Sequence, residues 1–226
     1  MKIYVVVPAF NEEASIGKVV KDIPRDLITE VIVVNNASSD NTVAVAEAAG
    51  ATVLTEMEQG YGAACLKGLA YIRQKNDANM VVFIDGDYSD YPQQMPLLIN
   101  PIINEDYDMV IGSRALGERD EGSMMPQQVF GNWLATTLIK LLYNYRFTDL
   151  GPFRAIKWEA LEQIAMQDRD YGWTVEMQVK AAKLGMKCTE VPVDYRKRIG
   201  KSKIAGTVKG TILAGYKILY TIFKLS

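Results

Sequence analysis

The central sheet of this protein can be traced outward from residues 81–90, which read Val81-Val82-Phe83-Ile84-Asp85-Gly86-Asp87-Tyr88-Ser89-Asp90. Four apolar residues without a charge predict a strand that is buried on both faces. Asp85 and Asp87 follow where this strand leaves the sheet, and ligands of open α/β sheets gather outside the carboxyl ends of the strands. The carboxylates alternate around Gly86, so both can turn to one side while glycine lets a ligand approach the backbone. The pair suits Mg²⁺ or Mn²⁺ bridging to substrate phosphates, although Asp and Gly also form ordinary turns.

Strand and helix patterns alternate on both sides of this stretch. Apolar runs, most of them rich in β-branched residues, predict strands at residues 3–7, 30–34, 51–54, 109–114 and 187–193. Between and after them, apolar residues at helical spacing predict helices near residues 16–23, 43–49, 60–75, 92–103, 130–143 and 207–225. Strands and helices in alternation are typical of a parallel sheet with right-handed crossovers.

Length and composition fit one large α/β domain over residues 1–226. The chain is 49% hydrophobic and 23% charged, and its net charge of −2 gives no general attraction to nucleic acid. It contains no histidine, which leaves carboxylates, Lys, Tyr, Cys or a bound metal for acid–base chemistry. Cys65 and Cys188 lack metal-ligand spacing, and Met1-Lys2 leads directly into a strand without a signal peptide. We therefore expect a cytoplasmic protein.

Two further segments predict phosphate contacts at the same edge of the sheet. The sequence Gln59-Gly60-Tyr61-Gly62-Ala63-Ala64 opens a helix with small residues, so the backbone amides of Gly62 and Ala63 can approach a diphosphate. Arg114 ends the strand at residues 109–114, where its guanidinium can bind phosphate in a bidentate manner. Glycine as a packing or turn residue, and arginine as a surface ion-pair partner, are the alternatives.

Seven short motifs follow one another along nearly the whole chain. They are Val7-Pro8-Ala9-Phe10-Asn11-Glu12-Glu13, Val33-Val34-Asn35-Asn36-Ala37-Ser38-Ser39-Asp40-Asn41-Thr42, Gly60-Tyr61-Gly62-Ala63-Ala64, Asp85-Gly86-Asp87, Ile111-Gly112-Ser113-Arg114, Thr148-Asp149-Leu150-Gly151-Pro152-Phe153-Arg154 and Gly200-Lys201-Ser202-Lys203. In this order they resemble the motifs of family 2 glycosyltransferases, close to the branch of dolichyl- and polyprenyl-phosphate sugar synthases. The resemblance implies a GT-A fold, a Rossmann-like three-layer α/β/α sandwich with a mostly parallel central sheet. It also implies a metal-dependent, inverting hexosyltransferase that uses a nucleotide-sugar donor.

By this resemblance, the first and the fourth motif bind the donor. It implies that the nucleotide pocket is lined by Pro8, Ala9, Asn11 and Glu12. Asp85-Gly86-Asp87 matches the DxD motif of the family, with Asp87 as the main ligand of Mg²⁺ or Mn²⁺ and Asp85 near the ribose or the metal. Arg114 matches an arginine that holds phosphate. A cation that bridges the diphosphate neutralises the leaving group as the glycosidic bond breaks.

Asn35 departs from the family pattern, which usually has an acid at the position that accepts a hydrogen bond from the base. An amide can still accept from uracil N3–H, whereas the two adjacent donors of guanine would suit a carboxylate better. The sequence therefore favours UDP over GDP.

Acceptor binding falls on residues 148–156, which resemble the acceptor loop of the family and are expected to present Asp149 and Arg154. The helix that begins near residue 173 is expected to offer Trp173 and Glu176 to the pocket. A hydroxyl acceptor needs a general base, for which Glu176 and Asp149 are the candidates. A phosphate acceptor is already ionised and needs none, in which case Glu176 orients a sugar hydroxyl or supports the fold.

The last thirty residues are basic and then amphipathic. Within residues 195–203, Arg198 and Lys203 are expected to bind a lipid phosphate or an anionic membrane surface, unless the run is a solvated face. The basic amphipathic helix at residues 207–225 can lie at the inner face of the cell membrane, or dock on the domain or on a dimer partner. Polyprenyl phosphate is the leading acceptor. A soluble or glycan hydroxyl acceptor, and a nucleotide-sugar-binding subunit without turnover, are the alternatives.

Overall fold

The computed structural model describes residues 1–200 and 208–226 of the chain. Within them, a sheet of seven strands has the order β3-β2-β1-β4-β6-β5-β7. The strands are β1 (Ile3–Ala9), β2 (Glu30–Asn35), β3 (Thr52–Thr55), β4 (Met80–Phe83), β5 (Met109–Ser113), β6 (Arg154–Lys157) and β7 (Cys188–Pro192). All neighbours pair in parallel except β6, which is antiparallel to both β4 and β5. The mostly parallel sheet expected from the alternating pattern is confirmed.

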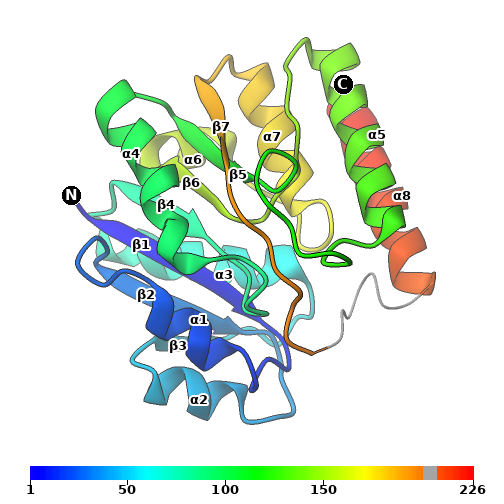
Figure 1. Ribbon diagram of the computed structural model, residues 1–226. Helices are drawn as coiled ribbons and strands as arrows, with labels where there is room; N and C mark the ends of the chain where they lie inside the picture. Colours follow the sequence, from blue (N-terminus) through cyan, green and yellow to red (C-terminus); the bar gives the residue numbers. More distant parts are fainter. Residues whose placement is uncertain (201–207) are drawn as a thin grey trace.

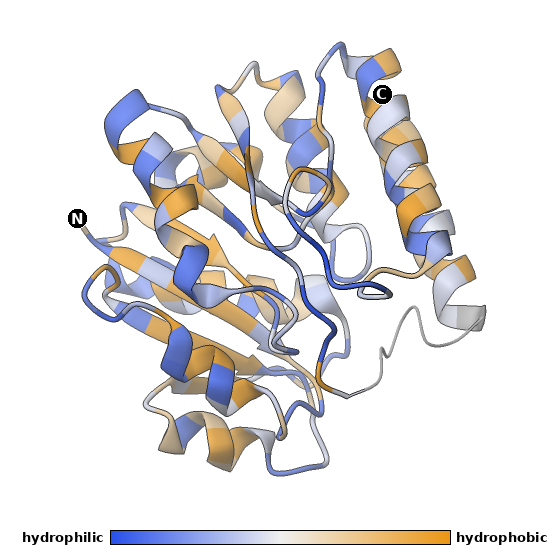
Figure 2. Ribbon diagram, in the orientation of Figure 1, coloured by the Kyte–Doolittle hydropathy of each residue, from blue (hydrophilic) through white to orange (hydrophobic). Residues whose placement is uncertain are grey.

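Helices cover both faces of this sheet, as Figure 1 shows. One face carries α1 (Ile16–Asp22), α2 (Thr42–Ala48) and α4 (Met95–Glu105), with the short 3₁₀ helix η1 (Pro92–Gln94) before α4. The other carries α3 (Tyr61–Lys75), α5 (Pro126–Tyr143), α6 (Trp158–Ile164), α7 (Trp173–Lys183) and α8 (Val208–Lys224). Alternate residues of β1 enter the two cores, Tyr4 and Val6 on one side and Ile3, Val5 and Val7 on the other. The strands are accordingly among the most hydrophobic parts of Figure 2. This is the three-layer α/β/α sandwich that the resemblance implies.

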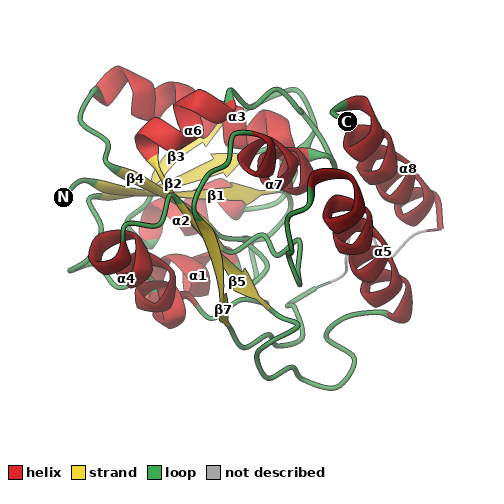
Figure 3. Cartoon of the chain, turned by 90° about the horizontal axis from the view of Figure 1, so that it is seen from above, coloured by secondary structure: helices red, strands yellow, loops and turns green. Residues whose placement is uncertain are grey.

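The last helix docks on the domain itself. In Figures 1 and 3, α8 lies beside α5, and it also contacts α7. Ile222 is fully buried, and the hydroxyl of Tyr143 on α5 donates a hydrogen bond to its carbonyl oxygen. Lys217 forms an ion pair of 2.9 Å with Asp168, in the loop before α7. Among the described residues, no helix combines the length and the apolar character that crossing a bilayer requires.

Three elements differ from the sequence prediction, and one of them is α6, a helix that it did not assign. Residues 154–157 form β6, whereas the prediction assigned residues 148–156 to an acceptor loop. A strand of four residues with a cation at each end carries too short an apolar run to be recognised. Helix α5 begins at Pro126 and not near residue 130, because Pro126 occupies its first turn and Gln128 completes a capping box with Met125.

The antiparallel direction of β6 matters for the site. Arg154, at the start of β6, pairs with Phe83, at the end of β4. The loop that precedes β6 therefore arrives at the edge of the sheet where β4 and β5 end. This brings Asp149 within reach of Arg114, which follows β5.

Candidate functional site

Two pockets meet at the carboxyl ends of β1, β4 and β5. We call the one of about 490 Å³, lined by the segment after β1, the β1-side pocket. The other, of about 300 Å³, is lined by residues of α5 and α8 and is called the α8-side pocket. Six residues border both pockets: Tyr61, Asp85, Asp87, Asp170, Tyr171 and Arg198. The acidic strand end after β4 thus lies on the boundary between two cavities.

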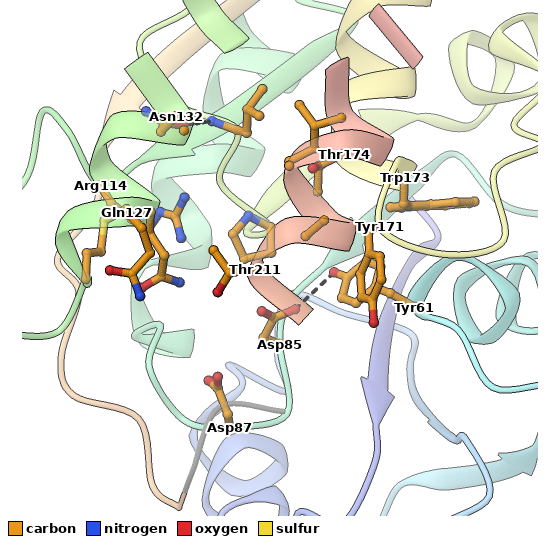
Figure 4. Close-up of a pocket in the computed structure, with 18 of the residues that line it drawn as sticks. Tyr61, Asp85, Asp87, Arg114, Gln127, Asn132, Tyr171, Trp173, Thr174 and Thr211 are labelled. Atoms are coloured by element: carbon orange, nitrogen blue, oxygen red, sulfur yellow. Dashed lines mark hydrogen bonds between the residues drawn. The ribbon is translucent and has the colours of Figure 1, made fainter. Parts of the chain in front are cut away.

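Asp85, the first of the two central carboxylates, is partly buried, whereas Asp87 is buried. Its Oδ1 accepts a hydrogen bond of 3.0 Å from the hydroxyl of Tyr61, which Figure 4 shows as a dashed line. Burial, together with the negative charge of Asp87, raises the pKa of Asp85 to about 7. Near neutral pH this carboxyl is therefore only partly ionised, and a bound cation would favour its ionised form.

Asp87 is held by its own turn and by a distant arginine. Its Oδ1 accepts hydrogen bonds from the backbone amide of Ser89 at 2.9 Å and from the Ser89 hydroxyl. Its Oδ2 lies 3.2 Å from Arg198 Nη1, while Arg198 Nη2 lies 3.1 Å from Glu12 Oε1. Arg198 therefore joins the segment after β1 to the strand end after β4, between the two pockets.

The donor set at this point suits a divalent cation that is shared with a ligand. No cluster of three or more Asp, Glu, Cys or His side chains that could hold a metal occurs within the parts of the chain that the structure describes. Asp85 and Asp87 would supply one or two carboxylate oxygens, and phosphate oxygens and water would have to complete the shell. This is the usual way in which Mg²⁺ is bound beside a substrate diphosphate. The residues present fit such a cation.

Arg114 is fixed by Asp149. Arg114 Nε and Nη2 both lie 2.7 Å from the carboxylate of Asp149, which also accepts the Arg114 backbone amide at 2.8 Å. Asp149 is almost fully buried. The guanidinium lies 5.1 Å from the ring centre of Tyr195 and lines the α8-side pocket. In Figure 4, Arg114 and Gln127 lie on one side of Asp85 and Asp87, and Tyr61 and Tyr171 on the other.

Several predicted residues do come together at this site. The β1-side pocket is lined by Pro8, Ala9, Glu12, Asp85, Gly86, Asp87 and Arg198. The α8-side pocket is lined by Asp85, Asp87, Arg114 and Arg198. Lys203 lies outside the described residues.

Asn11 and Asn35 shape the neighbouring loop and do not line either pocket. Asn11 Oδ1 accepts the backbone amide of Ser39, and Asn35 Oδ1 accepts that of Ser38 at 3.0 Å. Asn36 borders the β1-side pocket instead, and its Oδ1 accepts the amide of Gly60. The preference for UDP, which was based on Asn35, stays a prediction.

The expected anion site at the start of α3 is wrong. The amide of Ala63 donates to the carbonyl of Arg169 at 2.8 Å. A Cβ added to Gly62 would lie 2.0 Å from the carbonyl oxygen of Asp168, so a backbone segment already covers this glycine. Gly62 serves close packing and leaves no room for a phosphate at its position, whereas Gly60 borders the β1-side pocket.

The position of Arg154 also corrects the prediction that it faces the acceptor. Its side chain is fully buried, and its guanidinium donates to the carbonyl oxygens of Leu150, Gly151 and Thr174. Burial lowers the pKa of Arg154 to about 10, so it remains charged at neutral pH. Arg154 ties the loop before β6 to the start of α7.

Glu176 supports the fold, which is one of the two roles that the sequence left open for a phosphate acceptor. Its carboxylate accepts the backbone amides of Gln167 and Asp168 and lies 2.7 Å from Lys180 Nζ. It borders neither pocket. Asp149, the other predicted base, has both oxygens engaged by Arg114.

Asp90 is a feature of the site that the sequence analysis missed. It is almost fully buried, and neither carboxylate oxygen has a hydrogen-bond partner in the structure as described. Burial and the charges of Asp85 and Asp87 raise its pKa well above the usual range of an Asp. Its place three residues after Asp87 is the signal that could have drawn attention to it.

A mostly parallel sheet with paired carboxylates at a strand end and a cavity on each side is typical of α/β proteins that bind ligands outside the carboxyl ends of their strands. The family model described as Glycosyl transferase family 2 matches residues 4–165, more than half of the chain. The chain therefore belongs to glycosyltransferase family 2.

Relatives of known sequence agree with this family. An uncharacterised protein of Methanocaldococcus jannaschii is 30% identical over 98% of this chain and 90% of its own length. An undecaprenyl-phosphate mannosyltransferase of Micrococcus luteus is 27% identical over 93% of this chain and 90% of its own length.

The fold recurs in a solved structure, glucosyl-3-phosphoglycerate synthase of Mycobacterium tuberculosis in complex with Mn²⁺, UDP and phosphoglyceric acid. The TM-score is 0.78 at 23% identity, over 99% of this chain and 78% of that one. This likeness confirms the GT-A fold.

Proposed function

We propose that this protein transfers a hexose from a nucleoside diphosphate sugar to polyprenyl phosphate, with inversion and with Mg²⁺ or Mn²⁺. The observation that carries the proposal is the position of Asp85 and Asp87 on the boundary of two pockets, each of which also contacts Arg198. A donor in one cavity and an acceptor in the other would meet at these carboxylates. UDP is the favoured nucleotide.

The β1-side pocket is assigned to the donor. Its lining by Pro8, Ala9 and Glu12 matches the residues that the family resemblance gives to the nucleotide. Asp87, with Asp85, would hold the cation, which when bound neutralises the diphosphate as it leaves. The neighbour of known structure was solved with Mn²⁺ and UDP, which supports this assignment.

The α8-side pocket is assigned to the acceptor. Its walls include Leu150, Trp173 and Ile218, while Arg114 and Arg198 provide positive charge where it meets the carboxylates. An isoprenoid chain can lie against the apolar walls while its phosphate is held by the two guanidinium groups. An acceptor phosphate oxygen then forms the bond to the anomeric carbon as the bond to the donor diphosphate breaks, and no proton has to be removed.

The acid–base groups of the site favour a phosphate acceptor. Glu176 is turned into the fold and Asp149 is engaged by Arg114, so neither predicted base borders the reacting position. The Micrococcus relative, named an undecaprenyl-phosphate mannosyltransferase, also supports a lipid phosphate. A hydroxyl acceptor is the second candidate, because Asp170 borders both pockets and could serve as its base.

The outer faces of α5 and α8 support a location at the inner surface of the cell membrane. Phe130, Trp133, Ile212, Tyr216 and Phe223 are each more than half exposed. Aromatic side chains of this kind are typical of helices that lie in a membrane interface. An acceptor carried by the membrane would then reach the α8-side pocket between the same two helices.

The test is release of nucleoside diphosphate by the purified protein with Mg²⁺ or Mn²⁺. UDP- and GDP-sugars are compared with and without a short-chain polyprenyl phosphate. We expect release that depends on the lipid and falls at least about a hundredfold in Asp87→Asn, while Asp26→Asn, at an exposed position, keeps full activity. Release of nucleoside diphosphate in the presence of hydroxyl acceptors, if Asp170→Asn abolishes it, would favour the second candidate. Donor binding without release would indicate a binding subunit.

A further inference from the structure

A third pocket lies along the outer side of α5. It has a volume of about 360 Å³ and shares only Met124 and Asn132 with the lining of the α8-side pocket. Three cations border it: Arg119 in the loop before α5, Lys140 on α5 and Arg146 after α5. Nothing in the donor and acceptor assignments above makes use of this cavity, which we call the α5 pocket.

The cations of the α5 pocket are not neutralised by neighbouring acids. Within residues 1–200 and 208–226, the ammonium of Lys140 and the guanidinium of Arg146 have no hydrogen bond or ion pair. Arg119 Nη1 contacts only the sulfur of Met124, at 3.5 Å. Asp149 is the one carboxylate that borders the cavity, and Arg114 engages both of its oxygens. Cations therefore outnumber carboxylates in the lining of this pocket.

The two helices on this side of the molecule carry basic residues and no acidic ones. Helices α5 and α8 contain lysines but no Asp or Glu, although the whole chain has more acidic than basic residues. The surface of α5 and α8 thus complements an anionic partner.

Apolar side chains also line the α5 pocket, next to its cations. Val129, Trp133 and Phe147 form part of its wall. Trp133 is 59% exposed and lies 5.8 Å, between ring centres, from Phe130, which is 61% exposed. The ligand that fits is therefore a phosphate group carried on an apolar chain, and not a fully hydrated anion.

We propose that the α5 pocket binds the head-group phosphate of an anionic phospholipid. Arg119, Lys140 and Arg146 contact the phosphate, and Trp133 and Phe130 enter the interface beside it. Asn132 separates this pocket from the α8-side pocket and bonds to the backbone of Thr148 and Leu150. A lipid held here lies next to the opening through which, on the proposed function, the acceptor enters. The biological purpose rests on the proposed function, whereas the binding itself does not.

The experiment measures binding of the whole protein to vesicles of phosphatidylcholine with or without phosphatidylglycerol, without polyprenyl phosphate or donor. We expect binding that requires phosphatidylglycerol and that weakens about tenfold in the double variant Lys140→Gln/Arg146→Gln. The matched control is Lys21→Gln/Lys67→Gln, which removes two exposed lysines from α1 and α3 and should keep the affinity of the wild type.

Three outcomes would overturn the inference. The first is that the double variant binds vesicles as tightly as the wild type, or that the control variant loses as much vesicle affinity as the double variant does. The second is binding of inorganic phosphate alone that the double variant abolishes while vesicle binding stays unchanged, which assigns the pocket to a free anion. The third is no vesicle binding together with a dimer in light scattering that Trp133→Gln dissociates, which assigns the face to a second copy. Because no acceptor is present, failure of the transfer assay leaves these results unaffected.

Discussion

The buried carboxyl of Asp90 makes the stability of the fold depend on pH. Its buried carboxyl has no partner among the described residues, and its pKa lies well above the usual value for an Asp. An acid that keeps its proton longer in the folded chain than in the unfolded chain stabilises the fold at low pH. This contribution is lost progressively as the pH rises above about 4, the pKa in the unfolded chain.

Replacing this carboxyl should remove the effect. We expect the unfolding free energy of Asp90→Asn, relative to the wild type, to increase between pH 5 and pH 7. Urea unfolding at both pH values, without divalent cations, measures this difference. A difference for Asp90→Asn that does not change with pH would contradict the assignment.

At the scale of the element, the hydrogen bonds of Arg154 hold β6 in place. Its guanidinium joins the start of β6 to the loop before it and to the first turn of α7 through three backbone carbonyl oxygens. Removal of this donor leaves those buried acceptors without partners, which is among the more destabilising changes that a protein can undergo.

We therefore expect Arg154→Ala to lower the unfolding free energy by about 3 kcal/mol or more. The exposed ion pair of Arg73 with Glu162 provides the comparison, since Arg73→Ala should cost less than about 1 kcal/mol. Urea unfolding distinguishes the two. A stable Arg154→Ala protein with a weakened affinity for acceptor would instead restore the role that the sequence suggested.

Strand β6 also shows which part of the fold could not be predicted from the sequence. Buried parallel strands were recognised because runs such as Val81-Val82-Phe83 are short, apolar and rich in β-branched residues, and Asp85, Asp87 and Arg114 follow such runs. Arg154-Ala155-Ile156-Lys157 carries no such signal. Most partners of Arg154 and Glu176 are backbone groups, which leave no signal in the sequence, so only the folded chain reveals that these charges face inward. Arg198 was found through the family resemblance, because no local pattern relates it to Glu12, 186 residues away.

At the scale of the whole molecule, the α8-side pocket depends on two helices that come from distant parts of the chain. Gly131 on α5 and Gly215 on α8 both line the α8-side pocket, and a Cβ at either position would meet no atom within 4 Å. Larger side chains can therefore be placed there without strain.

Gly215→Leu should fill the cavity from one side and Gly131→Leu from the other. We expect each to raise the KM for polyprenyl phosphate at least about tenfold, because the leucine occupies volume that the isoprenoid needs. The affinity for the donor sugar should not change, and stability should rise slightly because leucine favours helix more than glycine does. Ile212→Phe, which enlarges a side chain of α8 outside the pocket, is the control. Unchanged kinetics in both leucine variants would place the acceptor elsewhere.

The insertion of an antiparallel strand between two parallel ones also orders events during synthesis on the ribosome. Strands β1 to β4 need only one another, so the first eighty-odd residues can assemble a four-stranded sheet as they emerge. Strand β5 finds no neighbour until β6 arrives some forty residues later, and Arg114 waits equally long for Asp149. The nascent chain can thus form the part of the sheet that contains β1 to β4 first, whereas Arg198 reaches the two pockets only when most of the polypeptide has been made.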